Sequence, residues 1–235
     1  MLLPVAILSG GFATRLRPLT EKIPKALVQV AGKPFVTWQL EYLRSQGAKR
    51  VVLCVGYLGE QLQAAVGDGS AYGLEVSYSW DGPALLGTGG ALRKAVSLLG
   101  DRFFVFYGDS YLPVDFQAVE LGFLQCGKPA LMTVLENHGR WDKSNVLFRQ
   151  GLIVEYNKHN PRPEMMHIDY GLGIMSASLL LDRPADSPFD IADIYHGLSV
   201  RGELAGFEVF ERFYEIGSQA GLQETDEFLA RGKQW

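Results

Sequence analysis

The stretch that decides the fold opens the chain: Leu3-Pro4-Val5-Ala6-Ile7-Leu8, then Ser9-Gly10-Gly11-Phe12-Ala13-Thr14-Arg15-Leu16-Arg17-Pro18-Leu19-Thr20, and soon after Pro24-Lys25-Ala26-Leu27. An apolar run leads directly into a loop of small residues that carries two arginines and is followed by a lysine. Backbone N–H groups exposed at the end of a strand, with cations nearby, suit a polyphosphate. We therefore expect a buried strand that ends in a phosphate-binding loop.

Two well-known phosphate motifs do not fit this loop. The dinucleotide-binding fingerprint requires G-x-G-x-x-G and an acidic residue that closes the second strand. Here the glycines Gly10 and Gly11 are adjacent, and the second apolar run, 51–55, is followed by Gly56-Tyr57. The Gly-Lys-Ser/Thr ending of a P-loop is absent from the stretch. The loop therefore matches neither motif.

Short apolar runs alternate with helical patterns through the first half, which predicts βαβ units. We expect strands at 3–8, 50–55, 74–78, 103–107, 130–136, 144–148, 152–156, 168–175 and 204–210, and helices at 35–45, 59–66, 89–99, 190–200 and 219–231. The predicted fold class is α/β, a Rossmann-like three-layer α/β/α arrangement with a mixed, mostly parallel central sheet. A length of 235 residues without a repeat or linker predicts a single domain over residues 1–235.

Composition excludes several classes of partner. A formal net charge of −4 argues against general nucleic-acid binding, which needs a basic face. Cys54 and Cys126 lie far apart in apolar contexts, so we expect two packed thiols rather than a disulfide or a metal pair. The N-terminal apolar run is too short for a signal peptide, and no run approaches the ~20 apolar residues that span a bilayer. We expect a cytoplasmic protein without a nucleic-acid or membrane partner; whether it forms a homo-oligomer stays open.

Three polar motifs follow strands directly: the opening loop, the segment Leu86-Gly87-Thr88-Gly89-Gly90-Ala91, and Asp109. Ligands of open α/β sheets lie beyond the carboxyl ends of the strands, so these motifs predict one composite site. The glycines of 86–91 leave room and free N–H groups for the edge of a base. Asp109, at the tip of an apolar strand, suits Mg²⁺, which prefers one or two carboxylates together with substrate phosphates.

The opening stretch is similar to the signature G-G-x-G-T-R-L-x-P-L-T…P-K-x-L of the sugar-1-phosphate nucleotidyltransferases, and nearly the whole chain resembles this family. The resemblance implies a fold of the nucleotide-diphospho-sugar transferase type. It also implies Mg²⁺-dependent transfer of a nucleoside monophosphate from an NTP to a sugar-1-phosphate, with release of pyrophosphate. Within the short forms, the G-T-G-G-A element looks most like heptose-1-phosphate guanylyltransferases, which favours guanylyl transfer to a heptose- or hexose-1-phosphate. Uridylyl, cytidylyl and thymidylyl transfer to another sugar remain alternatives.

The same resemblance implies roles for individual residues. Arg15 and Lys25 would be catalytic. The nucleotide would contact Leu8, Gly10, Gly11, Thr14, Arg15, Gly87, Thr88 and Gly89. The sugar phosphate would contact Lys158, Asp169 and Gly171, and Mg²⁺ would be held by Asp109 and Glu215.

Four positions depart from the family pattern. Ala13 stands where glycine is usual, and since alanine is less comfortable at positive φ we expect the loop to differ there. Glu215 replaces a more usual Asp and would need a backbone set further back to reach the same ion. Asn157 replaces a Glu next to Lys158. Asp169 lies where Asn-x-Gly is common, and a carboxylate cannot donate to a sugar as an amide does, which indicates a different sugar.

Two other classes of protein are alternatives to the transferase. A nucleotide-sensing homologue without turnover would keep the fold, but the retention of Arg15, Lys25 and Asp109 argues against it. A glycosyltransferase on a similar fold would need a D-x-D metal motif, which Asp109-Ser110-Tyr111 does not provide.

Overall fold

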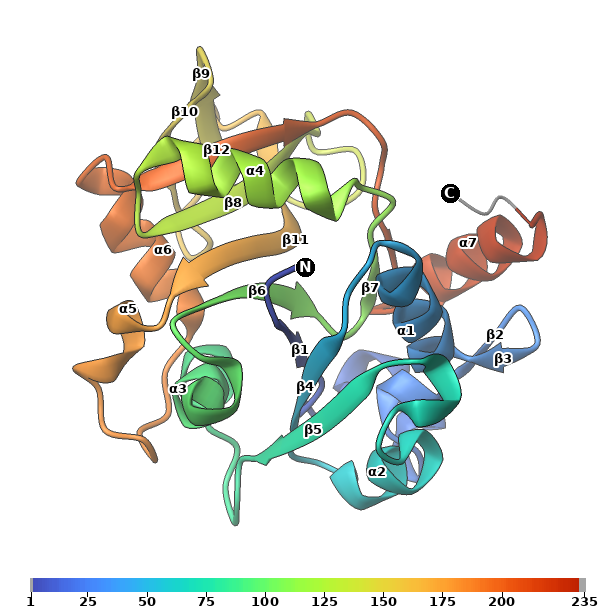
Figure 1. Ribbon diagram of the computed structural model, residues 1–235. Coiled ribbons are helices and arrows are strands. Elements are labelled where there is room, and N and C mark those ends of the chain that lie inside the picture. The colour runs from blue at the N-terminus through green and yellow to red at the C-terminus, as the bar shows by residue number, and fades with distance from the viewer. Residues whose placement is uncertain (1, 233–235) are drawn as a thin grey trace.

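The computed structural model describes residues 2–232, which form a central sheet covered by helices on both faces (Figure 1). The sheet has nine strands in the order β5-β4-β1-β6-β11-β8-β12-β10-β9. The strands are β1 (Val5–Leu8), β4 (Arg50–Val55), β5 (Glu75–Trp80), β6 (Arg102–Tyr107), β8 (Ala130–Glu136), β9 (Val146–Arg149), β10 (Leu152–Tyr156), β11 (His167–Ser176) and β12 (Leu204–Val209). The pairings set β10 and β11 against the direction of the other strands in this sheet, so it is mixed and mostly parallel. The predicted fold class is confirmed.

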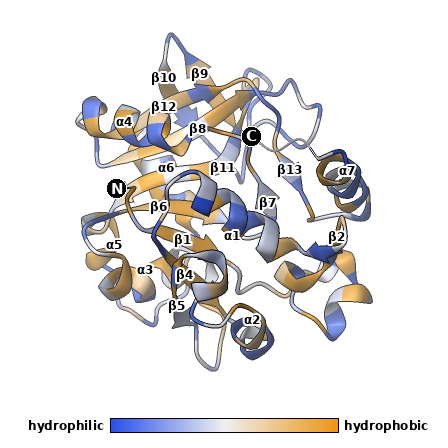
Figure 2. Ribbon diagram, turned by 45° about the vertical axis from the view of Figure 1, so that its right-hand side comes forward, coloured by the Kyte–Doolittle hydropathy of each residue, from blue (hydrophilic) through white to orange (hydrophobic). Residues whose placement is uncertain are grey.

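The helices divide between the two faces because the side chains of each strand alternate. Val5 and Ile7 of β1 join one apolar cluster and Ala6 joins the other. The first cluster includes side chains of α1 (Phe35–Ser45), α2 (Gly59–Val66), α4 (Phe116–Cys126) and α7 (Gln219–Ala230). The second includes those of α3 (Gly87–Leu99), α5 (Ser178–Leu181) and α6 (Ile191–Val200). Figure 2 shows apolar strands between these two helical layers.

Strand β6 illustrates why the sheet is buried on both sides. Its residues 103–106 are fully or almost fully buried, because Phe104 and Phe106 pack under α4 while Phe103 and Val105 face α3 and α6. Such an unbroken apolar run is typical of a strand with both faces covered. The run stops at Gly108-Asp109, where the strand ends.

Two short ribbons were not predicted. Strands β2 (Gln29–Val30) and β3 (Lys33–Pro34) form one, and β7 (Ser110–Tyr111) and β13 (Tyr214–Glu215) form the other. Helix α4 was also not among the expected elements; its N-terminus is capped by Asp115, whose carboxylate accepts from the N–H groups of Gln117 and Ala118. Helix α3 begins at Gly87 rather than at residue 89.

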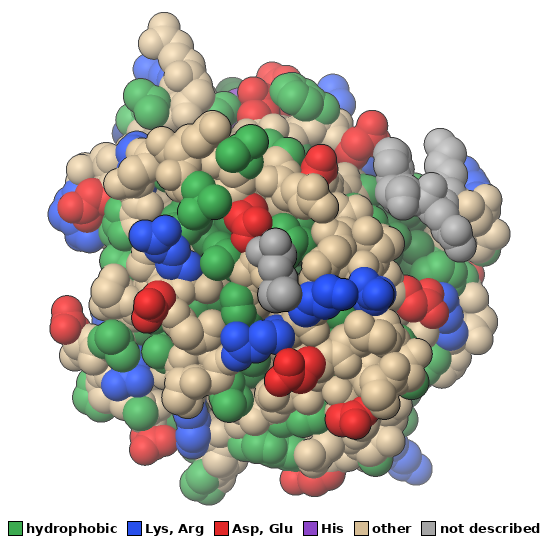
Figure 3. Space-filling model, in the orientation of Figure 1, with side chains coloured by type: hydrophobic (Ala, Val, Ile, Leu, Met, Phe, Trp, Pro, Cys, Tyr) green, Lys and Arg blue, Asp and Glu red, His purple; other side chains and the backbone are tan. Residues whose placement is uncertain are grey.

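Within residues 2–232, no helix has the length and apolar character needed to cross a membrane. Both Cys54 and Cys126 are free thiols, as expected, with Cys54 buried. On the face drawn in Figure 3, basic and acidic side chains are interspersed.

Candidate active site

The opening loop, Gly108 and Asp109 lie at the point where strand order reverses. The chain passes from β1 to β4 and β5 on one side and then returns to add β6 on the other side of β1. Ser9 N donates to the carbonyl of Cys54, and Gly108 N donates to the carbonyl of Leu8, so the three strand ends are held together. Ligands of open α/β sheets bind at such a point.

Ala13 adopts the conformation for which glycine is usual. Its φ is 48° and its ψ is 44°, in the left-handed region, so the backbone path expected of a glycine is kept by an alanine. The hydroxyl of Thr20 donates to the carbonyl of Ala13 at 2.8 Å and fixes this turn. We expected the loop to differ from the family pattern at Ala13. The backbone instead keeps the left-handed conformation, and the alanine side chain makes that conformation strained.

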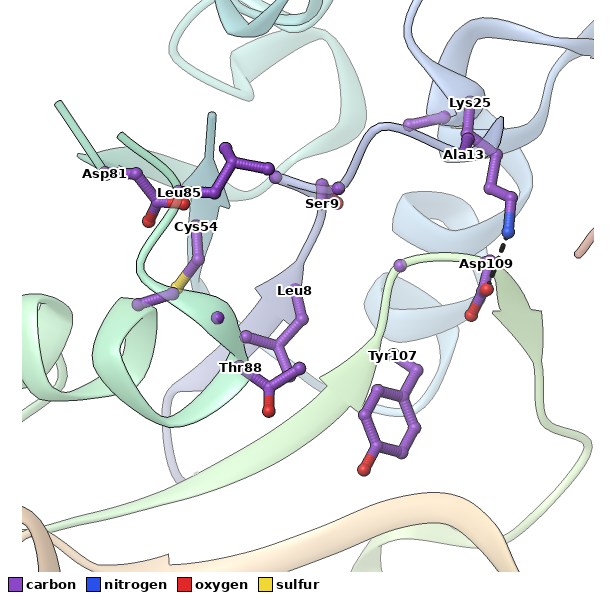
Figure 4. Close-up of a pocket in the computed structure, with 16 residues that line it drawn as sticks. Leu8, Ser9, Ala13, Lys25, Cys54, Asp81, Leu85, Thr88, Tyr107 and Asp109 are labelled. Atoms are coloured by element: carbon purple, nitrogen blue, oxygen red, sulfur yellow. Dashed lines mark hydrogen bonds and ion pairs between the residues drawn. The ribbon is translucent and has the colours of Figure 1, made fainter. Parts of the chain in front are cut away.

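A cavity of about 250 Å³ opens behind the loop. Figure 4 shows Asp81, Leu85 and Cys54 at one end of it, Leu8, Ser9 and Thr88 along it, and Lys25 with Asp109 at the other. One end thus offers apolar walls and a carboxylate, and the other offers the phosphate loop and a cation. This polarity suits a nucleoside triphosphate, with the base at the Asp81 end.

Asp81 was not singled out from the sequence. It follows β5, is only 6% exposed, and accepts a hydrogen bond from Leu86 N at 3.2 Å. Burial raises the pKa of this carboxyl, while the Leu86 N–H and the charge of Lys94 act in the opposite direction. Gly10 and Gly56 make room for it, since a Cβ on either would lie 3.1–3.2 Å from its Oδ2.

Lys25 and Asp109 form an ion pair at the phosphate end. The Nζ of Lys25 lies 2.7 Å from Oδ2 of Asp109, with side-chain exposures of 16% and 33%. Lys25 comes from a short 3₁₀ turn, Lys25–Leu27, that follows Pro24. A cation and a carboxylate from positions 84 residues apart therefore meet over the strand ends.

The β7–β13 ribbon brings Glu215 next to Asp109. Glu215 pairs with Ser110 in the ribbon, and Ile216 N donates to the carbonyl of Asp109 at 2.9 Å. The Glu215 carboxylate folds back so that Oε2 accepts from Gly217 N at 2.7 Å. Burial and the charge of Asp109 raise the pKa of Glu215, with Gly217 N, Lys25 and Arg15 acting against them. Two mutually repelling carboxylates beside a phosphate loop fit a divalent cation, which prefers one or two carboxylates.

A second cavity, of about 360 Å³, adjoins the first and shares Tyr107 and Asp109 with it. Its wall includes Lys158, Asp169 and Gly171, the three residues expected to contact a sugar phosphate. A bulge in β11 between residues 169 and 173 displaces the strand here, and Gly171 has a φ of +102°.

Asp169 is held inside this second cavity. It accepts from Gly171 N at 3.0 Å, and its Oδ2 lies 3.5 Å from the hydroxyl of Tyr107. Burial raises the pKa of Asp169 to about 6, although Gly171 N, the charge of Lys158 and the Tyr107 hydroxyl act against it. Lys158 itself is paired with Asp190, its Nζ lying 2.7 Å from Oδ2.

Not every predicted residue lines the cavity expected for it. Leu8, Gly10, Gly11, Gly87 and Thr88 line the first cavity. Arg15 lines the second one instead, near Glu215, while Thr14 and Gly89 line neither. The N–H groups of Gly89 and Gly90 are not free for a base, because both donate to the carbonyl of Phe189. Thr88 does not cap α3 but donates its hydroxyl to Asp190 at 2.8 Å.

Comparison with known proteins identifies the family of this chain. Residues 5–125, just over half of the 235-residue chain, match the family model described as nucleotidyl transferase. The chain belongs to this family. It is 42% identical over 113 residues to N-acetylmuramate alpha-1-phosphate uridylyltransferase of Neisseria meningitidis serogroup B, covering 48% of this chain and 49% of the relative. It is 34% identical over 115 residues to D-glycero-alpha-D-manno-heptose 1-phosphate guanylyltransferase of Campylobacter jejuni, covering 49% and 51%.

The matched segment thus spans about half the length of each of these two relatives. A longer match, 30% identical over 219 residues, covers 90% of this chain and 60% of the mannose-1-phosphate guanylyltransferase catalytic subunit beta of Xenopus tropicalis.

Solved structures share the fold of this family member. The crystal structure of HddC from Yersinia pseudotuberculosis complexed with GMP-PN superposes with a TM-score of 0.81 at 24% identity, covering 97% of this chain and all of that one. A putative glucose-1-phosphate thymidylyltransferase from Bacillus anthracis, in complex with a sucrose, gives a TM-score of 0.87 at 21% identity, with coverage of 100% and 97%. These structures establish the architecture, the nucleotide-diphospho-sugar transferase fold.

Proposed function

We propose that this protein transfers a nucleoside monophosphate from an NTP to a sugar-1-phosphate, giving an NDP-sugar and pyrophosphate. The observation that carries the proposal is the meeting of two cavities at Asp109. The first cavity has the opening loop at one end and Asp81 among apolar side chains at the other. The second cavity has Lys158 and Asp169, which we expect to face a sugar phosphate. Two substrates that exchange a phosphoryl bond need such adjoining sites.

In this mechanism a sugar-1-phosphate oxygen attacks the α-phosphorus of the NTP in line, and the bond to the pyrophosphate oxygen breaks. Lys158 holds the attacking phosphate, and Lys25 faces the α-phosphate on which charge grows. Arg15, which lines the second cavity near Glu215, reaches across to the leaving phosphates. Preorganised cations of this kind supply most of the catalysis in phosphoryl-type transfer.

Asp109 and Glu215 are the residues that would hold Mg²⁺. When bound, such a cation neutralises phosphate charge and orients the oxygens of the triphosphate. The carboxylates themselves keep their place through the β7–β13 ribbon and the Gly217 N–H.

For the base we propose guanine, with uracil or thymine as the alternatives. An ionised Asp81 only accepts hydrogen bonds, and guanine presents two adjacent donors, N1–H and N2–H, whereas uracil and thymine each present one, N3–H. The two relatives described above, a guanylyltransferase and a uridylyltransferase, support guanine and uracil. For the sugar, the acceptor-only Asp169 favours a heptose or hexose that offers a hydroxyl donor.

The test is a panel of GTP, UTP, CTP and dTTP against several hexose- and heptose-1-phosphates with Mg²⁺, read by pyrophosphate release. We expect turnover with one base and one class of sugar. Lys25→Ala should lower the rate roughly 10²–10³-fold, the usual effect of removing one transition-state contact. Lys22→Ala, an exposed lysine of the same loop, is the matched control and should be near normal. Nucleotide binding without pyrophosphate release from any pair would support a non-catalytic sensor instead.

A further inference from the structure

Asp190 lies between the two cavities and lines neither of them. It precedes α6, on the face of the sheet that also carries α3 (Figure 1). Its two carboxylate oxygens have different partners. Oδ1 accepts from the hydroxyl of Thr88 at 2.8 Å and from Ala192 N at 3.0 Å, whereas Oδ2 receives Lys158 at 2.7 Å.

These contacts join segments that are distant in the sequence. Thr88 comes from the first turn of α3 and lines the nucleotide cavity, while Lys158 follows β10 and lines the other cavity. The connection is reinforced on both sides of Asp190. Ile191 N donates to the Thr88 hydroxyl at 2.9 Å, and the preceding carbonyl, of Phe189, accepts from Gly89 N at 2.9 Å. The start of α6 and the start of α3 are therefore one hydrogen-bonded unit.

Capping α6 does not account for this arrangement. An N-cap needs a single side-chain acceptor, and Oδ1 already provides it. The remaining ion pair is partly open to solvent, with side-chain exposures of 49% for Lys158 and 31% for Asp190, and exposed pairs contribute little to stability. What Oδ2 does provide is a fixed position for the Lys158 ammonium, which would otherwise move on four rotatable bonds.

We propose that Asp190 is a positioning residue that holds Lys158 toward the sugar phosphate and ties it to the nucleotide-side turn of α3 through Thr88. This inference rests on the proposed function, since it assigns Lys158 to the phosphate of the acceptor. The hydrogen bonds that Asp190 accepts more than offset the effect of its burial and lower its pKa, so the carboxylate stays charged beside Lys158. Asp169 is the second carboxylate that faces this lysine.

The test is a double-mutant cycle on kcat/KM for the sugar-1-phosphate, using the substrates found in the panel above. Asp190→Asn keeps the N-cap, because Asn caps as well as Asp. It replaces the charged carboxylate that faces Lys158 with an uncharged amide group. We expect kcat/KM for the sugar-1-phosphate to fall about tenfold, mostly through a higher KM, while KM for the NTP stays within about twofold. In a Lys158→Met background the same change should cause no further loss, because the group it positions is gone.

Asp193→Asn is the matched control. Asp193 lies in the first turn of the same helix, and its Oδ1 lies 3.5 Å from Nε2 of His159, so its replacement also removes one negative charge and alters one side-chain contact of α6. It should leave both KM values within about twofold. Equal melting temperatures of the Asp190→Asn and Asp193→Asn variants would confirm that the cap is intact.

Two results would overturn the proposal and are distinguishable from each other. If the wild type turns over but Asp190→Asn and Lys158→Met multiply their separate effects, Asp190 does not act through Lys158 and this inference alone fails. If the wild type releases no pyrophosphate from any pair, the proposed function fails and the inference fails with it.

Discussion

Ala13 shows that the loop requires a backbone conformation rather than a particular residue. Alanine at φ 48° costs about 1–2 kcal/mol relative to a right-handed conformation, and a glycine would not bear this cost. We expect Ala13→Gly to raise the free energy of unfolding by about 0.5–1 kcal/mol, because part of the gain is lost to the greater freedom of glycine in the unfolded chain. Urea unfolding measures it, and turnover should stay within about twofold.

Ala31 provides the control for this change. It has a φ of 47° in the turn between β2 and β3, away from both cavities, so Ala31→Gly should give a similar gain in stability and unchanged turnover. A fall in turnover confined to Ala13→Gly would mean that the methyl group itself contributes to the site.

Asp169 should give the protein a pH-dependent stability. Its pKa is about 6 in the folded chain against 3.8 without burial, so between these values the folded state binds the extra proton. Stability from this group is therefore present at low pH and is lost as pH rises toward about 6. We expect the free energy of unfolding of the wild type to fall relative to that of Asp169→Asn between about pH 4 and 6. Denaturation by urea at a series of pH values would show it; a constant difference would contradict the assignment.

The β7–β13 ribbon places Glu215 beside Asp109. A methyl group on Gly217 would collide with Oε2 of Glu215 and lie 3.1 Å from Nη2 of Arg15. We expect Gly217→Ala to displace the carboxylate and raise the Mg²⁺ concentration for half-maximal turnover at least about tenfold. Gln219→Ala, at an exposed position of α7, is the control, and an unchanged Mg²⁺ titration in Gly217→Ala would argue against Glu215 as a ligand.

Sequence patterns predicted the main elements but not the ribbons, and the reason is physical. Strand β6 can be predicted from the sequence, because a strand covered on both faces must be apolar throughout. Strands of two residues are too short to show a periodic pattern of apolar residues. The strands β7 and β13 can therefore be identified only from their pairing in the folded structure. The identity of Glu215 as a neighbour of Asp109 came from family resemblance, and the structure supplies the pairing that explains it.

The remaining differences at the site arise from tertiary contacts. Glycines at 89 and 90 looked free to meet a base, but a carbonyl from Phe189, about a hundred positions away, takes both N–H groups. Asp190 carries no local signal, because its partners Thr88 and Lys158 are 102 and 32 positions distant. In the sequence, Asp81 is simply an acidic residue after a strand. Only the order of the strands in the sheet shows that it lines a cavity.

At the scale of the whole molecule, a nucleotide in the first cavity should stabilise the fold. A ligand at 100 times its dissociation constant adds about 2.7 kcal/mol, which for a chain of this size corresponds to about 5–10 °C in melting temperature. We expect the base that supports turnover to give this shift, and the other three nucleotides a smaller one. Differential scanning fluorimetry with each NTP would measure it. Four equal shifts would show that the cavity does not distinguish bases and would contradict the role of Asp81.

The late arrival of β13 has a consequence for synthesis on the ribosome. Every strand that borders the nucleotide cavity is complete by residue 107, whereas Glu215 is supplied by the second strand of a ribbon whose first strand ends at Tyr111. A nascent chain that has not reached residue 215 lacks the carboxylate opposite Asp109, and before residue 190 it also lacks the contacts that hold the start of α3. We expect chains that stop short of Glu215 to release no pyrophosphate, so that competence for chemistry begins only when the second strand of this ribbon has been made.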